Sequence, residues 1–468
     1  MRSWHFVGIC GIGMSALAQF AAAMQIKVTG SDRALDNPEN AALKAMLEAQ
    51  NIELFKQDGS RFDSGNPPVD AVVYSTAIEE SNPDFAASQG IERIHRATAL
   101  KGLILDRCSG NKVSVAVAGT CGKTSTTAII SEALYNASAD PECINGGMIK
   151  AFMQDIYPGN YHPGKGAIVF EADESDKSLL EFHPDYALAL NIGTDHYPKA
   201  ELAEMFATFV NQCRIGAVLE REVFELIGSR LNPELAIKVF SGKADDSNWY
   251  VSDYKSSDGK SFAAFNNGTF EELPAPGRHT ALNIAAAAAL LELMQYDPAD
   301  ALKFALNTHG VARRFDCKGQ TLSGAKVYDD YAHNPEKLAT VFKAAREVTG
   351  SVGKVLMLFQ PHGYGPFKFM AEELGRVFNT VLQPGDKVYL AEPFYAGGTS
   401  SFSPHAKDVL QMWKSSYPAI NVELFEDRKE LKNLLLDQAG ANDVILIAGA
   451  RDNTLAEFAS ELASTGKA

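Results

Sequence analysis

The chain has 468 residues, more than one hydrophobic core usually holds, so we expect two or three domains. Hydrophobic residues make up 46% and charged residues 22%, as in an ordinary soluble globular protein. The formal net charge of −15 argues against nonspecific binding to nucleic acid or to anionic membranes, because both need a basic surface.

The N-terminus shows no basic run followed by an apolar stretch, so we expect no signal peptide. No apolar run reaches about 18 residues, so we expect no transmembrane helix and a cytoplasmic location. The six cysteines are scattered and none forms a C-x-x-C pair, so the usual zinc and redox spacings are absent. The expected state is a monomer or a weak homodimer.

Three segments repeat the order of an apolar strand, a glycine turn and a helix. The strands lie at 5–8, 113–118 and 326–328, and the helices begin at about Ser15, at Lys123 and at about Pro335. Alternation of this kind predicts parallel sheets covered by helices. The predicted fold class is therefore α/β, with three domains that are each built on a mainly parallel sheet flanked by helices. We expect a Rossmann-like N-terminal domain, a central domain like the P-loop ATPases, and a Rossmann-like C-terminal domain.

The predicted domains are 1–108, 109–312 and 313–468. Further strands are expected at 26–30, 71–75, 91–94, 167–172, 186–191, 354–359, 386–391, 420–424 and 443–448. Residues 245–274 alternate like antiparallel strands. The alanine-rich helix after His279 is expected to be buried.

The first glycine turn has glycines at 8, 11 and 13, so the dinucleotide fingerprint G-x-G-x-x-G is absent and Cys10 stands at its second glycine. A diphosphate could still rest on the N-terminus of the helix that follows. Asp32 ends the next strand, where an acidic residue could meet a ribose hydroxyl, and Ser75 and Thr76 end a third strand. These features indicate a nucleotide-linked ligand. The alternative is that the glycines only allow close helix packing.

The second glycine turn reads G-T-C-G-K-T over residues 119–124, between an apolar strand and a helix. Glycines let backbone N–H groups approach phosphate oxygens, and the helix N-terminus adds partial positive charge. Lys123 could neutralise phosphates and the Thr124 hydroxyl could bind Mg²⁺. The strict phosphate-loop pattern fails because Val117 replaces its first glycine, so a tight turn with a surface lysine is the alternative.

Acidic residues follow the strand at 167–172, in the order Glu171, Asp173, Glu174 and Asp176. Carboxylates at the carboxyl end of a parallel strand face the crevice where ligands bind, and they are ligands that Mg²⁺ prefers. The next strand leads to Asn191, Asp195 and His196, which predict a metal or phosphate role. A solvated acidic turn and a structural histidine are the alternatives.

Taken in order along the chain, these segments resemble the Mur ligase family of peptidoglycan synthesis, and most of all its branch that joins L-alanine to UDP-N-acetylmuramate. The motifs that carry the resemblance are GIGMS (11–15), GTCGKTST (119–126), EADESD (171–176), TDH (194–196), GRHTALN (277–283), RRF (313–315), DDYAHNP (329–335) and QPH (360–362).

The resemblance implies an ATP-dependent amide ligase that works through an acyl phosphate and releases ADP and phosphate, and thus serves cell-wall biogenesis, cell shape and cell division. Its implied partners are UDP-N-acetylmuramate and an amino acid, L-alanine in that branch, with no nucleic acid and no membrane. The UDP part would be held by Gly11, Ile12, Gly13, Met14, Ser15, Asp32, Ser75 and Thr76. ATP would be held by Gly119, Thr120, Cys121, Gly122, Lys123, Thr124, Ser125, Asn283, Arg314, Asp330 and His333. Mg²⁺ or Mn²⁺ would be held by Thr124, Glu171 and His196, and the catalytic residues would be Lys123, Glu171, His196 and Arg314.

The chain departs from the family pattern at several positions. Cys121 replaces the usual histidine of the phosphate loop, Cys10 replaces a glycine, and Gly193 stands where an acidic residue is frequent. After QPH the branch continues R-Y-[ST]-R, whereas this chain reads GYGPFK, and its GARD (449–452) replaces G-A-G-D. Lys368 could supply one charge, but a lysine is not equivalent to a bidentate arginine.

These departures leave the ATP chemistry in place and leave the added amino acid open. A Mur-type ligase for a different amino acid or for a recycled peptide is therefore an alternative. A folylpolyglutamate-type ligase would not need the first nucleotide-binding block. A nucleotide-binding oxidoreductase or sensor is the alternative from another class, and the imperfect fingerprint at 8–13 counts against it.

Overall fold

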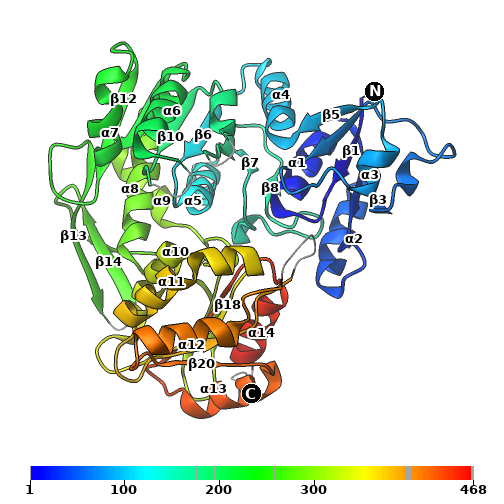
Figure 1. The fold of residues 1–468 in the computed structure, drawn as a ribbon. Helices are drawn as coiled ribbons and strands as arrows, with labels where there is room; N and C mark the ends of the chain where they lie inside the picture. Colours follow the sequence, from blue (N-terminus) through cyan, green and yellow to red (C-terminus); the bar gives the residue numbers. More distant parts are fainter. Residues whose placement is uncertain (1, 175–176, 194–196, 258, 396–401, 465–468) are drawn as a thin grey trace. The chain divides into compact units, whose positions relative to one another are not determined.

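The computed structural model describes residues 2–174, 177–193, 197–257, 259–395 and 402–464 (Figure 1). The chain forms two compact units. The first comprises Met1–Asp253, Ala264–Phe270 and Ala281–Val311, and the second comprises Tyr254–Ala263, Glu271–Thr280 and Ala312–Ala468.

The first sheet has the strand order β3-β2-β1-β4-β5, and all its neighbouring strands are parallel. Its helix α1 is rich in alanine, and Ala16, Leu17 and Phe20 of this helix join Phe6 of β1 in the buried core. The strands are β1 (Ser3–Val7), β2 (Lys27–Asp32), β3 (Glu53–Lys56), β4 (Ala71–Tyr74) and β5 (Glu92–His95). The helices are α1 (Ile12–Ala23), η1 (Pro38–Asn40), α2 (Ala41–Ala49), η2 (Ser60–Phe62), α3 (Pro83–Ala87) and α4 (Arg96–Cys108).

The second sheet has the order β15-β14-β13-β12-β11-β10-β6-β9-β7-β8. At its centre, β6 pairs in parallel with both β9 and β10 and is buried along its whole length. The strands are β6 (Ser114–Ala118), β7 (Glu142–Ile144), β8 (Tyr161–His162), β9 (Ile168–Glu171), β10 (Tyr186–Ala189), β11 (Gly216–Glu220), β12 (Ala236–Ser241), β13 (Trp249–Ser257), β14 (Lys260–Phe265) and β15 (Phe270–Glu272). The helices are α5 (Lys123–Asn136), η3 (Lys150–Phe152), η4 (Ser178–Glu181), α6 (Lys199–Asn211), α7 (Arg221–Ile227), η5 (Gly228–Arg230), α8 (Arg278–Leu293) and α9 (Pro298–Leu306).

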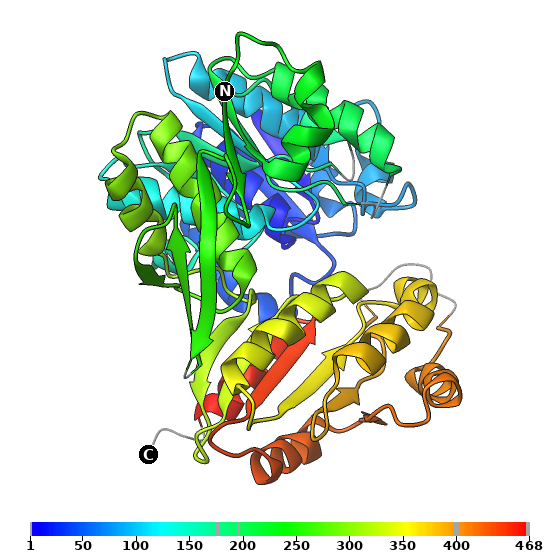
Figure 2. The ribbon, with the colours of Figure 1, turned by 90° about the vertical axis from the view of Figure 1, so that its left-hand side faces the viewer.

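The third sheet lies in the second unit and has the order β16-β17-β21-β18-β19-β20, with only the β16–β17 pair antiparallel among its described pairs (Figure 2). Successive side chains of a strand point to opposite faces, and both faces are apolar here. Met357 and Phe359 of β18 share one core with α10, α11 and α12, whereas Leu356 and Leu358 share the other with α13 and α14. The strands are β16 (Asp316–Gln320), β17 (Lys326–Asp330), β18 (Val355–Gln360), β19 (Lys387–Leu390), β20 (Val422–Leu424) and β21 (Val444–Gly449). The helices are α10 (Pro335–Thr349), α11 (Tyr364–Val381), α12 (Ala406–Ser416), α13 (Arg428–Gln438) and α14 (Thr454–Ser464).

The predicted fold class is confirmed, because three mainly parallel sheets are flanked by helices. The predicted strands all appear, shifted by a few residues at most, and helix starts at Lys123 and Pro335 are as predicted. The alanine-rich part of α8 is buried, from Ala285 to Leu291. Within the described ranges, every helix is too short or too polar to span a bilayer. The predicted domain boundaries at 108 and 312 stay predictions.

Candidate functional site

The turn between β6 and α5 needs its two glycines. Gly119 has φ 147° and Gly122 has φ 89°, which are backbone conformations that side chains disfavour. A Cβ atom at Gly119 would also lie 2.9 Å from Cβ of Leu190, closer than two carbon atoms can approach without a shift. Gly122 precedes the first residue of α5, so the turn delivers backbone N–H groups to the helix N-terminus, where anions bind well.

The chain that follows β10 braces this turn. The Asn191 side chain accepts a hydrogen bond from the Cys121 N–H at 2.8 Å and donates one to the Cys121 carbonyl at 2.9 Å. The Gly193 N–H donates to the Thr120 hydroxyl at 2.8 Å. A Cβ atom at Gly193 would lie 2.9 Å from Cγ2 of Thr120, so the small residue at 193 permits the close approach. Hydrogen bonds from Asn191 and Gly193 therefore hold the backbone of this turn in one conformation.

Lys123 extends back along the turn toward the acidic segment. Its ammonium donates to the Gly119 carbonyl at 2.8 Å and to the Glu174 carboxylate at 2.7 Å, and it lies 3.7 Å from Asp173. The Glu174 side chain is only 3% exposed. Burial lowers the pKa of Lys123, but Glu174 and Asp173 outweigh this effect and raise it above its ordinary value. Lys123 is thus a permanent cation at the helix N-terminus.

The predicted cation ligands Thr124 and Glu171 lie together. The Thr124 hydroxyl donates to Glu171 at 3.1 Å, and the Gly146 N–H donates to the other carboxylate oxygen at 2.5 Å. Two oxygen donors at the end of a strand, next to a phosphate-type turn, suit Mg²⁺, which uses one or two protein ligands together with phosphates and water. No group of three or more histidine, cysteine or acidic side chains suited to a metal occurs in the described part of the chain. His196, Asp195 and Asp176 lie outside the described residues.

Ser125 and Asn283 complete the surroundings of the turn. Ser125 is half-buried in the first turn of α5. The amide oxygen of Asn283, from α8, lies 3.4 Å from the position that a Cβ atom at Gly122 would take. Asn283 is therefore next to the turn although 161 positions separate it from Gly122 (283 − 122).

The first glycine turn joins β1 to α1, with Gly11 at the helix N-cap. Asp32 accepts hydrogen bonds from the N–H groups of Cys10 at 2.9 Å and Ala34 at 2.8 Å, so its carboxylate holds the turn. Burial and the neighbouring Asp32 raise the pKa of the Cys10 thiol, which keeps it unreactive.

The other predicted residues of this region differ in accessibility. Ile12 and Gly13 are half-buried, whereas Met14 and Ser15 are buried. The Ser15 hydroxyl donates to the Gly11 carbonyl at 3.0 Å and accepts from Asn160 at 2.8 Å. Ser75 and Thr76 follow β4, half-buried and exposed respectively. The Ser15 N–H also donates to the Gly11 carbonyl at 2.8 Å, so the backbone and the hydroxyl of Ser15 both hold the start of α1.

The predicted residues of the second unit lie at the carboxyl end of β17. Asp330 is 9% exposed and accepts hydrogen bonds from the N–H groups of Phe315 at 2.6 Å and Ala332 at 2.7 Å. The Arg314 guanidinium lies 5.5 Å from the ring centre of Tyr331. His333 donates through Nδ1 to the Tyr331 carbonyl at 2.8 Å, and burial together with Lys337 lowers its pKa to about 3. His333 is therefore neutral at neutral pH.

Sequence reasoning missed two residues at these sites. Gly146 is the backbone donor that fixes Glu171. Arg96, the first residue of α4, lies 3.6 Å from Asp173. Its position directly after a predicted parallel strand was the available signal, because ligand-binding residues gather at such strand ends.

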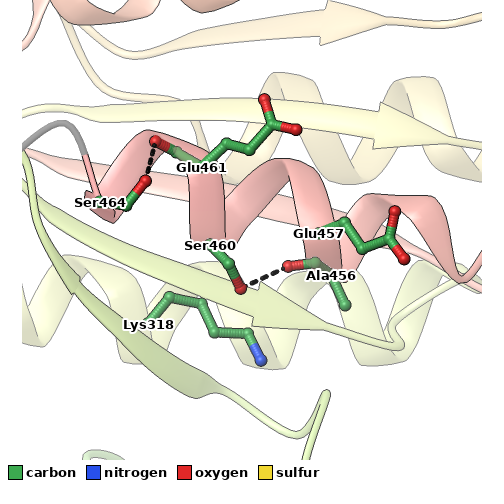
Figure 3. A pocket seen from close by; sticks show the side chains of 6 residues that line it. All are labelled: Lys318, Ala456, Glu457, Ser460, Glu461 and Ser464. Atoms are coloured by element: carbon green, nitrogen blue, oxygen red, sulfur yellow. Dashed lines mark hydrogen bonds between the residues drawn. The ribbon is translucent and has the colours of Figure 1, made fainter. Parts of the chain in front are cut away.

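A hollow on the second unit contains none of the predicted residues (Figure 3). It lies beside α14 and is lined by Lys318, Ala456, Glu457, Ser460, Glu461 and Ser464. The Ser460 and Ser464 hydroxyls donate to carbonyls of their own helix, and Lys318 pairs with Asp316 at 2.6 Å. These three side chains thus have partners of their own, and the strand ends described above make the better candidate site.

Comparison with protein families gives three matches in chain order. They are to the Mur ligase family, catalytic domain (residues 3–107), the Mur ligase middle domain (117–291) and the Mur ligase, glutamate ligase domain (313–451).

Individual relatives agree with these matches. The chain is 31% identical to a UDP-N-acetylmuramate–L-alanine ligase of Thermobifida fusca, over 96% of this chain and 94% of that protein. Among solved structures, a UDP-N-acetylmuramate–alanine ligase of Thermotoga maritima has a TM-score of 0.79 at 24% identity, over 99% of this chain and 98% of that one. A murein peptide ligase of Psychrobacter arcticus has a TM-score of 0.70 at 19% identity, over 100% and 99%. These two structures share the fold of this chain.

Proposed function

The chain belongs to the Mur ligase family, the ATP-dependent ligases of peptidoglycan synthesis, and on that premise we propose that it joins L-alanine to UDP-N-acetylmuramate. Relatives that carry this activity in their names match the chain at 31% and 30% identity over 94% and 95% of their own lengths. The observation that carries the proposal is the turn at 119–124. In it, Lys123 donates a hydrogen bond to Glu174 and Thr124 donates one to Glu171.

In the proposed reaction, the muramate carboxylate attacks the γ-phosphate of ATP, and an acyl phosphate and ADP form. The amine of L-alanine then attacks the acyl carbon, an amide bond forms, and phosphate leaves. Lys123 would offset negative charge on the phosphoryl group during its transfer, which is mainly an electrostatic and positioning task. The backbone N–H groups at the N-terminus of α5, which begins at Lys123, would orient the phosphates.

A divalent cation, Mg²⁺ or Mn²⁺, would neutralise phosphate charge when bound. The oxygens of Thr124 and Glu171 fit such an ion, since they are hard donors only 3.1 Å apart. We propose His196 as the further ligand that the family pattern implies. Arg314, Asp330 and His333 are proposed to serve ATP as well, with Arg314 adding positive charge.

The added amino acid is the open part of the proposal. The segment GYGPFK replaces the expected R-Y-[ST]-R and forms the start of α11, where Lys368 is exposed. A ligase for another amino acid or for a recycled peptide is therefore the second candidate. The oxidoreductase alternative falls away with the family membership.

The test is release of phosphate from ATP. We expect release only when UDP-N-acetylmuramate and an amino acid are both present, with L-alanine preferred over glycine, L-serine and a murein tripeptide. Preference for the tripeptide would refute the alanine assignment. Release without any UDP-sugar would refute the proposal as a whole.

The Lys123→Ala variant tests the phosphate turn. We expect it to abolish amide formation and to leave the dissociation constant of UDP-N-acetylmuramate within about twofold of the original, because the two ligands use different turns. Lys27→Ala, at an exposed lysine of the first sheet, is the control and should keep full activity. Turnover of Lys123→Ala like that of the unchanged chain would contradict the assigned role.

A further inference from the structure

Arg96 stands at the junction of the two glycine turns, where it contacts Gly13 and Asp173. It follows β5 directly and opens α4, whose N-cap is His95. Helices α1 and α4 lie side by side in the first unit (Figure 1). The N-terminus of α1 carries the turn that is proposed to hold the nucleotide-sugar, so Arg96 lies on the neighbouring helix beside it.

The Arg96 guanidinium rests against Gly13. A Cβ atom at Gly13 would lie 3.2 Å from Nη1 of Arg96, so a side chain at 13 would require the guanidinium to shift by a few tenths of an ångström. The absence of a side chain at 13 thus leaves room for the guanidinium in its present position. The guanidinium therefore lies beside the first turn of α1.

The opposite end of the guanidinium faces the acidic segment of the phosphate site. Nη2 of Arg96 lies 3.6 Å from one oxygen of Asp173, and the other oxygen lies 3.7 Å from the Lys123 ammonium. The Asp173 carbonyl accepts hydrogen bonds from the Leu179 N–H at 2.9 Å and the Ser178 hydroxyl at 3.1 Å, which fix the backbone there. One carboxylate therefore sets the positions of two cations, one for each turn.

We propose that Arg96 binds the diphosphate of the nucleotide-sugar substrate and that Asp173 orients it for this task. The inference rests on the proposed function. A planar guanidinium matches the geometry of phosphate oxygens and can bind two of them at once. The positive end of the α1 dipole favours the same anion. Because Asp173 also contacts Lys123, the diphosphate of one substrate and the triphosphate of the other are aligned by a shared carboxylate.

The experiment measures dissociation constants for UDP-N-acetylmuramate, UDP-N-acetylglucosamine, UDP and uridine by titration calorimetry. For Arg96→Ala we expect the three diphosphates to bind roughly 10- to 100-fold more weakly, as expected for the loss of charge-assisted hydrogen bonds. Uridine should bind unchanged. Arg96→Lys should lose less affinity for the diphosphates than Arg96→Ala, because lysine keeps the positive charge but cannot bind two phosphate oxygens in the bidentate geometry of arginine. Arg2→Ala removes an exposed ion pair with Asp106 in the same unit and should change nothing.

Kinetics provide a second measurement. The KM for UDP-N-acetylmuramate should rise with the dissociation constant, while kcat and the KM for ATP stay within about twofold. An equal loss for uridine, or no loss for UDP, would overturn the inference. A loss confined to UDP-N-acetylmuramate and absent for UDP-N-acetylglucosamine would also overturn it, because Arg96 would then bind the carboxylate. If Arg96→Ala does not fold, Arg96→Lys decides by the same comparison.

The outcome separates this inference from the proposed function. Failure of the unchanged chain to bind any UDP-sugar would refute the proposed function and the role of Arg96 together. Tight binding and full ligation by Arg96→Ala would refute the role of Arg96 alone.

Discussion

Glu174→Gln tests how the turn between β6 and α5 holds Lys123 before nucleotide binds. Lys123 and Glu174 are 2.7 Å apart, with side chains 14% and 3% exposed. At an effective dielectric constant of about 20, their attraction is about 6 kcal/mol. The burial of two charges offsets several kcal/mol of this, which leaves about 2 kcal/mol, as for other charge-assisted hydrogen bonds.

In the proposed function, bound ATP would change this balance, because its phosphates would pair with Lys123 and leave Glu174 beside them as an unpaired carboxylate. The amide of Glu174→Gln carries no charge to repel the phosphates. We therefore expect the variant to be less stable than the unchanged chain without nucleotide, by about 2 kcal/mol, and to regain the difference with nucleotide. By linkage, its affinity for nucleotide rises about 30-fold.

The assay combines calorimetric titration with a non-hydrolysable ATP analogue and thermal unfolding with and without that analogue. Glu181→Gln is the matched control, since Glu181 pairs with Lys101 at 3.1 Å in an ion pair whose side chains are 45% and 33% exposed. Exposed pairs contribute little, so both measurements should barely change. Weaker nucleotide binding by Glu174→Gln would refute the reasoning and place Glu174 among the groups that attract the nucleotide.

Three other predictions concern separate parts of the chain. Glu142→Ala should destabilise the fold by about 3–5 kcal/mol in urea denaturation, because the fully buried carboxylate binds Arg107, Lys112 and Tyr161 and its removal leaves buried charge unpaired. Gly193→Ala should raise the KM for ATP severalfold with little change in folding, because the new Cβ would press on Thr120; an unchanged KM would contradict the bracing described here. Burial raises the pKa of Asp329 to about 6, so the folded protein holds this proton more tightly than the unfolded chain does. The free energy of unfolding should therefore fall by roughly 3 kcal/mol as the pH rises from about 4 to about 6. Asp329→Asn should remove this dependence of stability on pH. The same dependence in both proteins would contradict the role given to Asp329.

The sequence predicts the sheets well because buried parallel strands are continuous apolar runs. Residues 113–118 are such a run, and β6 is fully buried there. The strand β3 was not predicted, since its residues Glu53–Lys56 form a half-exposed edge strand of mixed polarity. Edge strands have a weak hydrophobic pattern in the sequence, because solvent rather than a core lies against one of their sides.

The parts of the candidate site whose residues are neighbours in the sequence were predictable. The contacts between residues far apart in the sequence were not. The turn at 119–124 and the acidic segment after β9 each appear as one motif. The bond between Cys121 and Asn191 spans 70 positions, and no spacing rule predicts such a contact. The place of Arg96 after a predicted strand was a signal, but its contacts with Gly13 and Asp173 were not predictable, because they form only once the strands are ordered in space.

The same contacts explain why departures from the family motif need not disturb the phosphate turn. Val117 replaces a glycine of the strict pattern, but it is a buried residue of β6 paired with Leu188 and Glu171, so the strand extends where the strict motif would already turn. At Cys121, Asn191 binds both backbone groups, so the shape of the turn depends on the peptide and not on the side chain. Only Gly119 and Gly122 are fixed by backbone conformation, and both are present. Under the proposed function, the departures that bear on the added amino acid are therefore those of the second unit, at 363–368 and 451.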